Sequence, residues 1–275
     1  MSSLVVRLDN SISLLPLWSI LLIYVSVLLV VVLLAIWRKW LTISGLVGSF
    51  VLGFIVLYLG GFSSFLILLF FFISSSLLSK IKRAVNKKEK KGNKRDLEQV
   101  LANGIPCLIG LFLTRRTFFL RIGLIGFSSS LAEATADTWS GVFGIMSKKE
   151  PVSIVTFTKV PRGLSGGVTV LGLLSGLLGS FLVASLHSLI FSAGIHDILI
   201  IASSGFLGSV IDSLLGATVQ EHFRDNSGLL TEKEGEDGIR YERVRGIPGF
   251  NNDSVNFCSG ILSLSLSLLL STLIK

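Results

Sequence analysis

Long apolar stretches separated by short polar ones run through the whole chain. Windows of about 17–22 apolar residues predict membrane-spanning helices, because about 20 such residues cross the hydrocarbon core of a bilayer. Eight spans are predicted, at residues 17–36, 42–59, 62–79, 99–114, 121–145, 168–190, 198–219 and 254–274. Longer polar loops are predicted at 80–98, 146–167 and 220–253. The pattern therefore predicts an all-α, polytopic integral membrane protein whose residues 1–275 form a single transmembrane domain.

The composition agrees with this fold class. Apolar residues make up 51% of the chain and charged residues 15%, and the mean hydropathy is +0.76. The apolar run that begins near residue 17 is too long for a secretory signal peptide. Cys107 and Cys258 both fall in apolar segments, which argues against a disulfide framework. Three scattered histidines argue against a zinc site.

The net charge of +8 is carried mainly by the loops between the predicted spans. The loop at 80–98 has nine Lys or Arg residues against three acids. If both termini lie on the non-cytoplasmic side, 20 of the 25 basic residues face the cytoplasm, which is the bias that sets membrane topology. The charge therefore indicates an orientation in the lipid bilayer and argues against a nucleic-acid partner. It identifies neither the host membrane nor the oligomeric state.

Two predicted spans carry a carboxylate away from their ends. Asp137 lies in the span at 121–145 and Asp212 in the span at 198–219. A charged side chain at the centre of a bilayer costs about 2.5–3.5 kcal/mol on insertion scales. In the orientation above, both aspartates lie in the cytoplasmic halves of their helices. We therefore expect each to face a cavity, a cation or a ligand.

Acidic and small residues share a helix face with each aspartate. Glu133 precedes Asp137 by four residues, so the two could bind one cation together; alternatively, one acid is protonated and forms a hydrogen bond between helices. Gly208 and Gly216 lie four residues on either side of Asp212. They would let a partner helix or a phosphate approach closely, although a helix-packing face explains the glycines equally well.

Further polar residues lie at the starts of two other predicted spans, on the same side of the membrane. Asn103 lies near the start of the span at 99–114, and Asn252, Asp253 and Asn256 lie around the start of the last span. The unusual polar residues are thus expected at a similar depth, with the far halves of the helices nearly bare of them. The serine-rich stretch at 263–267 is interpreted as a lipid-compatible helix segment.

A glycine-rich turn precedes the sixth predicted span. Lys159 and Arg162 come just before Gly163, Gly166 and Gly167. Consecutive backbone N–H groups near a helix N-terminus, with basic side chains beside them, form an anion site. The spacing does not match the nucleotide-binding loop GxxxxGK[ST]. A turn without a ligand is the alternative interpretation.

These residue types together suit phosphoryl transfer to a lipid. Carboxylates hold Mg²⁺, the metal bridges the phosphates of a nucleoside triphosphate, and basic groups neutralise the developing charge. A phosphate monoester has a second pKa near 6, so it is a nucleophile at neutral pH without a dedicated base. The candidate metal ligands are Asp137, Asp212, Glu133 and Asp253. The candidate phosphate-binding residues are Arg162, Gly163, Gly166, Gly167, Asn103, Asn252 and Asn256. The candidate catalytic residues are Asp137, Asp212 and Lys159.

Four ordered motifs resemble one known family. They are Asp137-Thr138-Trp139 and the segments 159–172, 208–220 and 252–256, and the segment 98–104 is similar too. Over residues 45–270 the chain resembles the uncharacterised integral membrane protein family that contains transmembrane protein 19 and the phytyl-phosphate kinase of plant tocopherol synthesis. The resemblance implies phosphorylation of an isoprenoid monophosphate, such as phytyl or geranylgeranyl phosphate, by a nucleoside triphosphate such as CTP.

One position departs from the family pattern, and two other functions stay open. The family pattern has a Glu three residues after the Trp, whereas Val142 stands there in this chain. Val142 makes a non-catalytic membrane scaffold one alternative. Intramembrane carboxylates with glycine-interrupted helices also suit a secondary transporter or channel. A transporter would need polar residues that continue to the far face of the membrane.

Overall fold

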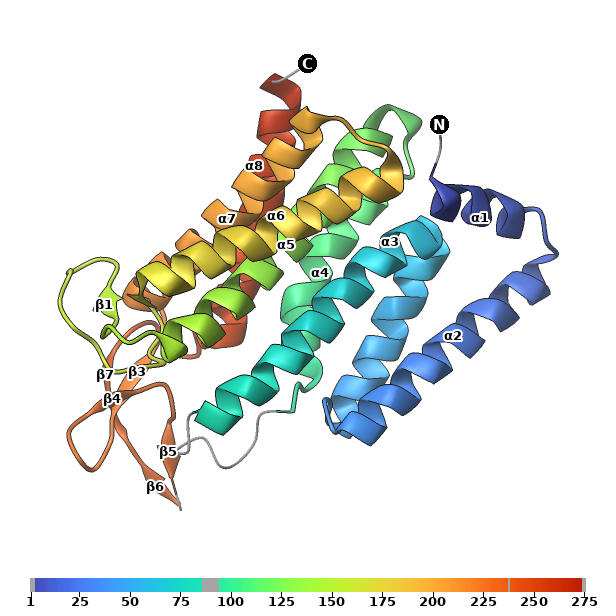
Figure 1. The fold of residues 1–275 in the computed structure, drawn as a ribbon. Helices are drawn as coiled ribbons and strands as arrows, with labels where there is room; N and C mark the ends of the chain where they lie inside the picture. Colours follow the sequence, from blue (N-terminus) through green and yellow to red (C-terminus); the bar gives the residue numbers. More distant parts are fainter. Residues whose placement is uncertain (1–2, 86–93, 237, 274–275) are drawn as a thin grey trace.

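The computed structural model describes residues 3–85, 94–236 and 238–273, and this part of the chain is mainly helical. Its long helices lie side by side as a bundle (Figure 1). The helices are α1 (Leu4–Ser13), α2 (Leu17–Arg38), α3 (Ile43–Val85), α4 (Leu97–Leu113), α5 (Leu120–Met146), α6 (Val170–Phe191), α7 (Ile195–Thr218) and α8 (Asn252–Leu273), with a short 3-10 helix, η1 (Thr117–Phe119). Residues 86–93 of the predicted basic loop and residue 274 of the last predicted span lie outside the described residues.

Five helices are long and apolar enough to cross a membrane, by length and composition, within the described chain. They are α2, α3 as far as Ile81, α6, α7 and α8. The shorter α4 is apolar as well. This composition confirms the predicted all-α, polytopic membrane fold.

The long helix α3 consists of two arms that meet at a kink. Gly61 has a φ of 65° and a ψ of −168°, which a helix cannot accommodate. The Asp9 carboxylate of α1 accepts hydrogen bonds from the backbone N–H groups of Phe62, at 2.7 Å, and Ser63, at 3.0 Å. The first N–H groups of a helix have no partner within the helix, so Asp9 caps the second arm as an N-cap residue does. The sequence patterns did not predict α1, whose function in the fold is this cap.

Helix α5 lies at the centre of the bundle, where it packs against α3, α4, α6, α7 and α8. Glycines at the crossings permit the close approach. A Cβ on Gly110 of α4 would meet the backbone of Phe127, and one on Gly205 of α7 would lie 2.5 Å from the Cβ of Ala132. Small residues at membrane helix interfaces act in this way, because they let backbones come close enough for dense packing.

Short strands gather at one end of the bundle, here called the strand end (Figure 1). β1 (Val152–Ser153) pairs with β2 (Gly167–Val168), and β4 (Leu230–Thr231), β3 (His222–Arg224) and β7 (Glu242–Arg245) form a three-stranded antiparallel sheet. β5 (Gly235–Glu236) and β6 (Ile239–Arg240) form a hairpin. The loop at 220–253 therefore contains regular β structure. The described ends of the chain lie at the other end of the bundle.

Candidate functional site

A polar pocket opens at the strand end, among α5, α6, α7 and the connections between them. It encloses about 900 Å³ of empty space, part of which is open to solvent. The polar and glycine residues that line it are Asp137, Ser140, Gly141, Gly144, Arg162, Gly163, Ser165, Gly166, Gly167, Thr169, Gly172, Ser209, Asp212, Ser213, Glu232 and Asn252. The structure thus brings both intramembrane aspartates and the glycine-rich turn to one cavity. We call it the polar pocket.

The glycine-rich turn is held against α7 by its backbone conformation. Gly163 and Gly166 have φ angles of +85° and +82°, which side chains with a Cβ rarely adopt. A Cβ on Gly166 would lie 2.6 Å from the Cα of Ala217, so only glycine fits there. The Thr169 hydroxyl then accepts a 3.0 Å hydrogen bond from the Gly172 N–H and caps α6. The turn and the first residues of α6 both line the pocket, so an anion bound there would lie beside the start of this helix, where anions are favoured.

A carboxylate already occupies part of this anion site. Glu232, from the loop that follows α7, lines the polar pocket and accepts a 2.6 Å hydrogen bond from the backbone N–H of Ser165. Ser165 lies between the two glycines of positive φ. A carboxylate and a phosphate accept the same kind of charge-assisted hydrogen bond. The contact shows that the turn can bind an anionic oxygen.

The intramembrane carboxylates form a cluster beside the turn. The Ser259 hydroxyl of α8 lies 2.9 Å from Oε1 of Glu133 and 3.0 Å from Oδ2 of Asp212. Asp137 lies close enough to both acids to interact with them electrostatically. Glu133 and Asp212 are buried, whereas Asp137 is half-buried at the pocket wall. Asp137 and Asp212 therefore face the cavity while Glu133 supports them from behind.

The donor set fits a magnesium ion only if a ligand contributes. Within the described residues, no three His, Cys, Asp or Glu side chains are arranged to hold a metal on their own. Magnesium in phosphoryl-transfer sites uses one or two carboxylates, water and the phosphates of the substrate. Asp137 and Asp212, whose carboxylates both line the polar pocket, match that requirement.

The remaining predicted site residues lie around the polar pocket or away from it. Lys159 is exposed and pairs at 2.6 Å with Glu150, whose charge and hydrogen bond raise the pKa of the lysine. Arg162 lines the pocket but donates to the carbonyl oxygens of Ile145, at 2.9 Å, Ser147 and Lys148, so it also closes the end of α5. The side chains of both residues therefore bind partners outside the glycine-rich turn.

The predicted asparagines and Asp253 do not all lie in the same place. Asn252 lines the polar pocket, whereas Asn103 lines another cavity, between α2, α3 and α4. Asn256 and Asp253 each have a buried oxygen without a hydrogen-bond partner among the described residues. The charges that act on Asp253 are those of Asp96 and Glu98, beside α4. The structure thus brings Asn252, but not these three residues, to the pocket wall.

Val142, where the family pattern has Glu, is buried and is not among the residues that line the polar pocket. The change from an acid to an apolar residue therefore leaves the pocket wall intact. Ser140 and Gly141, immediately before it, do line the pocket.

Buried serines, to which the sequence patterns gave no role, connect the cluster of carboxylates to the far end of the bundle. Ser263 of α8 donates toward the carbonyl oxygens of Ser129 and Ser204, at 3.0 Å each. Further along, Ser128 lies 2.8 Å from Nδ1 of His187, and Arg121 forms an ion pair with Asp197. The prediction that the far halves of the helices are nearly bare of polar groups is therefore wrong. We call this series of buried contacts the polar seam.

The interpretation of residues 263–267 as a lipid-compatible segment is wrong for Ser263, which bonds to other helices, whereas Ser265 and Ser267 donate to carbonyl oxygens of their own helix. Ser259, Ser263, Ser267 and Ser271 recur every four residues and are all buried on one face of α8. Serine at four-residue spacing was the signal in the sequence that could have revealed this face. The leucines that alternate with serines at 263–267 suggest a period of two residues instead.

The fold and the pocket define a class: a polytopic α-helical membrane protein with an acidic and glycine-rich pocket at one end of its bundle. The model of the integral membrane protein family DUF92 matches residues 26–264. The chain belongs to this family, and it is an integral membrane protein.

Relatives of the chain occur in archaea and plants. An uncharacterized membrane protein of Methanocaldococcus jannaschii is 38% identical over 198 residues, which cover 70% of this chain and 82% of the relative. Protein PGR of Arabidopsis thaliana is 30% identical, over 82% of this chain and 87% of its own length. The chloroplastic protein VTE6 of the same plant is 26% identical, over 66% of this chain and 57% of its own. No solved structure matches the chain.

Proposed function

We propose that the protein is a membrane-embedded lipid-phosphate kinase. It transfers a phosphoryl group from a nucleoside triphosphate, such as CTP, to an isoprenoid monophosphate such as phytyl or geranylgeranyl phosphate. One observation carries the proposal: Asp137 and Asp212 line the same cavity as a glycine-rich turn that binds an anionic oxygen. The motif resemblance to the family of the plant phytyl-phosphate kinase supports the choice of substrate.

In this proposal the pocket aligns two phosphates. A Mg²⁺ ion on Asp137 and Asp212 would neutralise charge on the phosphates of the nucleotide. The turn at Gly163–Gly167 and the N-terminus of α6 hold phosphate oxygens through backbone N–H groups. An oxygen of the isoprenoid phosphate forms the new bond to the terminal phosphorus, the bond to the bridging oxygen breaks, and the nucleoside diphosphate leaves. Because the acceptor is already anionic at neutral pH, alignment and charge neutralisation supply the catalysis.

The orientation is part of the same proposal. The strand end would face the cytoplasm and both termini the opposite side. The connections at the strand end carry basic residues, among them Lys148, Lys149, Arg224, Arg240, Arg243 and Arg245. That placement agrees with the charge bias of membrane topology and gives a cytoplasmic nucleotide access to the polar pocket.

The direct test is a phosphoryl-transfer assay with the purified protein in detergent or nanodiscs. It combines Mg²⁺, radiolabelled CTP or ATP, and phytyl or geranylgeranyl phosphate. We expect a radiolabelled isoprenoid diphosphate whose formation stops when EDTA is added. Lack of diphosphate with every nucleotide and acceptor, while an active relative forms it in parallel, would refute the kinase.

Replacing Glu232 with Gln is expected to strengthen nucleotide binding. The variant removes a negative charge that competes with phosphate for the turn and leaves a neutral, weaker acceptor on the N–H of Ser165. A hydrogen bond to a charged group contributes about 1.5–3 kcal/mol, so we expect Kd for the nucleotide to fall roughly tenfold. Isothermal titration with a non-hydrolysable nucleotide measures the change.

Glu234→Gln is the matched control for this prediction, because Glu234 is exposed in the same loop and is not among the residues lining the polar pocket. It should leave Kd unchanged. Equal affinities of wild type, Glu232→Gln and Glu234→Gln would show that the turn does not bind the nucleotide.

The polar seam favours one second candidate, a secondary transporter that couples ion movement to the same acids. The seam, however, is densely packed where it meets the cluster: a Cβ on Gly208 would lie 2.6 Å from Cγ of Glu133 and 2.8 Å from Cβ of Ser263. A transport path would have to open there. Ion-driven uptake by proteoliposomes without nucleotide turnover is the result that would establish the transporter instead of the kinase.

A further inference from the structure

A second cavity lies between α2, α3 and α4, and no helix that lines it also lines the polar pocket. It encloses about 730 Å³ of empty space, part of which is open to the surroundings of the protein. Its walls run along α2 from Leu28 to Ala35 and along the second arm of α3 from Phe65 to Phe72. Eight helical residues extend about 10 Å, so the cavity follows these two helices for about two turns.

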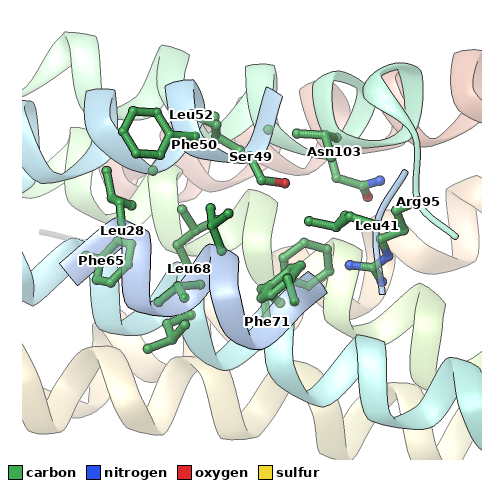
Figure 2. A pocket seen from close by; sticks show the side chains of 18 of the residues that line it. Leu28, Leu41, Ser49, Phe50, Leu52, Phe65, Leu68, Phe71, Arg95 and Asn103 are labelled. Atoms are coloured by element: carbon green, nitrogen blue, oxygen red, sulfur yellow. The ribbon is translucent and has the colours of Figure 1, made fainter. Parts of the chain in front are cut away.

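One end of this cavity is apolar and the other is polar (Figure 2). Leu28, Phe50 and Phe65 lie at the apolar end, and Arg95 and Asn103 lie at the polar end. Gln99 lies between Arg95 and Asn103 in steps of four residues and lines the cavity with them. The Nδ2 of Asn103 donates to the backbone oxygen of Gln99 at 2.9 Å, which orients the amide.

Arg95 is held in place by its backbone. Its N–H donates to the Trp40 carbonyl at 3.1 Å, and its carbonyl accepts from the Thr42 N–H at 3.0 Å. These bonds fasten the start of α4 to the connection between α2 and α3. The guanidinium lies 5.2 Å from the centre of the Phe71 ring, in a cation–π contact. The position of the guanidinium at the end of the cavity is therefore built into the fold.

The guanidinium carries a charge without a counter-ion in the described structure. No carboxylate lies within ion-pair distance of Arg95 among residues 3–85, 94–236 and 238–273. Burial lowers the pKa of Arg95 to about 10, which still leaves the group protonated at neutral pH. Arg95 is half-buried, and a charge withdrawn from water is stabilised by an opposite charge, so an anionic group at this end of the cavity would be favoured.

We propose that this cavity binds a lipid with one aliphatic or isoprenoid chain and a phosphate headgroup. The chain lies along α2 and the second arm of α3, and the headgroup contacts Arg95, Gln99 and Asn103. Helix α2 forms the outer wall of the cavity, because it buries only Tyr24, Leu28 and Ala35 and its other residues are available to the bilayer. The site is separate from the polar pocket and does not depend on the kinase activity.

Photolabelling tests this site on the full-length protein in nanodiscs. The probe is hexadecyl phosphate with a diazirine near the middle of its chain, and mass spectrometry locates the labelled peptides. We expect labels on α2 between residues 28 and 35 and on α3 between 65 and 72. Unlabelled hexadecyl phosphate should displace the probe at least about tenfold better than hexadecanol, since only the phosphate can pair with Arg95.

Variants separate the charge from the apolar walls. Arg95→Gln should reduce the labelling at least about tenfold. Arg38→Gln is the matched control, because Arg38 also stacks on an aromatic ring, 4.4 Å from the centre of Trp37, but does not line the cavity. It should label like the wild type, and so should Asp212→Asn in the polar pocket.

Three outcomes would overturn the proposal. They are labels spread equally over lipid-facing positions such as Leu174 and Leu178 of α6, hexadecanol competing as well as hexadecyl phosphate, and full labelling of Arg95→Gln. The competition result uses the wild-type protein only, so it stands even if a variant does not fold. Because the readout is binding, kinase activity with no specific labelling would refute this site and leave the proposed function intact.

Discussion

Replacing Asp212 with Asn is expected to abolish phosphoryl transfer while the protein remains folded. Asp212 and Asp137 line the same wall of the polar pocket, and in the proposed function both carboxylates would be direct ligands of the ion. Changes to groups that merely support a metal ligand already cost about 10- to 100-fold, so loss of a direct ligand should lower kcat/KM by at least about 100-fold. Asp137→Asn should have an effect of the same size. The assay is diphosphate formation at saturating Mg²⁺.

A carboxamide has nearly the shape of a carboxylate, and it removes charge from a crowded acidic cluster. Both variants should therefore elute as monodisperse protein in detergent and unfold no lower than the wild type. Glu242→Gln serves as the control, because Glu242 is exposed on β7 and is not among the residues that line the polar pocket. It should keep full activity. Folded Asp137→Asn and Asp212→Asn proteins with wild-type kcat/KM would exclude the two aspartates from catalysis.

The largest effect on stability is expected for Gly166→Ala. Gly166 has a φ of +82°, and an added Cβ would lie 2.5 Å from the Cβ and 2.7 Å from the backbone N of Ala217. Strain at a positive φ costs about 1–3 kcal/mol, and overpacking of a tight contact costs about 1–3 kcal/mol more. We therefore expect a loss of about 2–6 kcal/mol in the free energy of unfolding, measured by chemical denaturation in detergent micelles.

Gly141→Ala is the matched control, since Gly141 lines the same pocket and receives the same methyl group. No heavy atom lies within 4 Å of the position of its Cβ, and it is in the regular helix α5. Alanine is a better helix former than glycine, so this variant should be neutral or more stable by up to about 1 kcal/mol. If the two variants had equal stability, the close contact between the turn and α7 would not be present in solution.

The sequence alone sufficed to locate much of the polar pocket. Asp137 and Asp212 are conspicuous because a carboxylate in an apolar run is costly wherever the run ends up in the bundle. The glycine-rich turn was visible because positive φ angles and a helix start depend on neighbouring residues only. All of these residues line one cavity. Signals of this kind are local, and local physics can be assessed along the chain.

Other members of the predicted site could not be assigned in this way. Asn103 resembles Asn252 in the sequence, for both lie near the start of a helix, yet they line different cavities. Lys159 belongs to the glycine-rich segment but pairs with Glu150 at the surface. Whether a side chain faces one cavity or another depends on the rotation of its helix against its neighbours. That rotation is set by packing between segments far apart in the chain.

The hydrophobic pattern of the chain was enough to predict the fold class and to single out Asp137 and Asp212. Each side chain has its own free energy of transfer into the bilayer, so this information can be read along the sequence. Only the tertiary structure decided which partners those acids have. Ser259 lies 126 residues from Glu133, and Glu232 lies 67 residues from Ser165, yet each pair is joined by a hydrogen bond. Such contacts arise when helices and loops pack together, so no periodicity or spacing in the sequence encodes them directly.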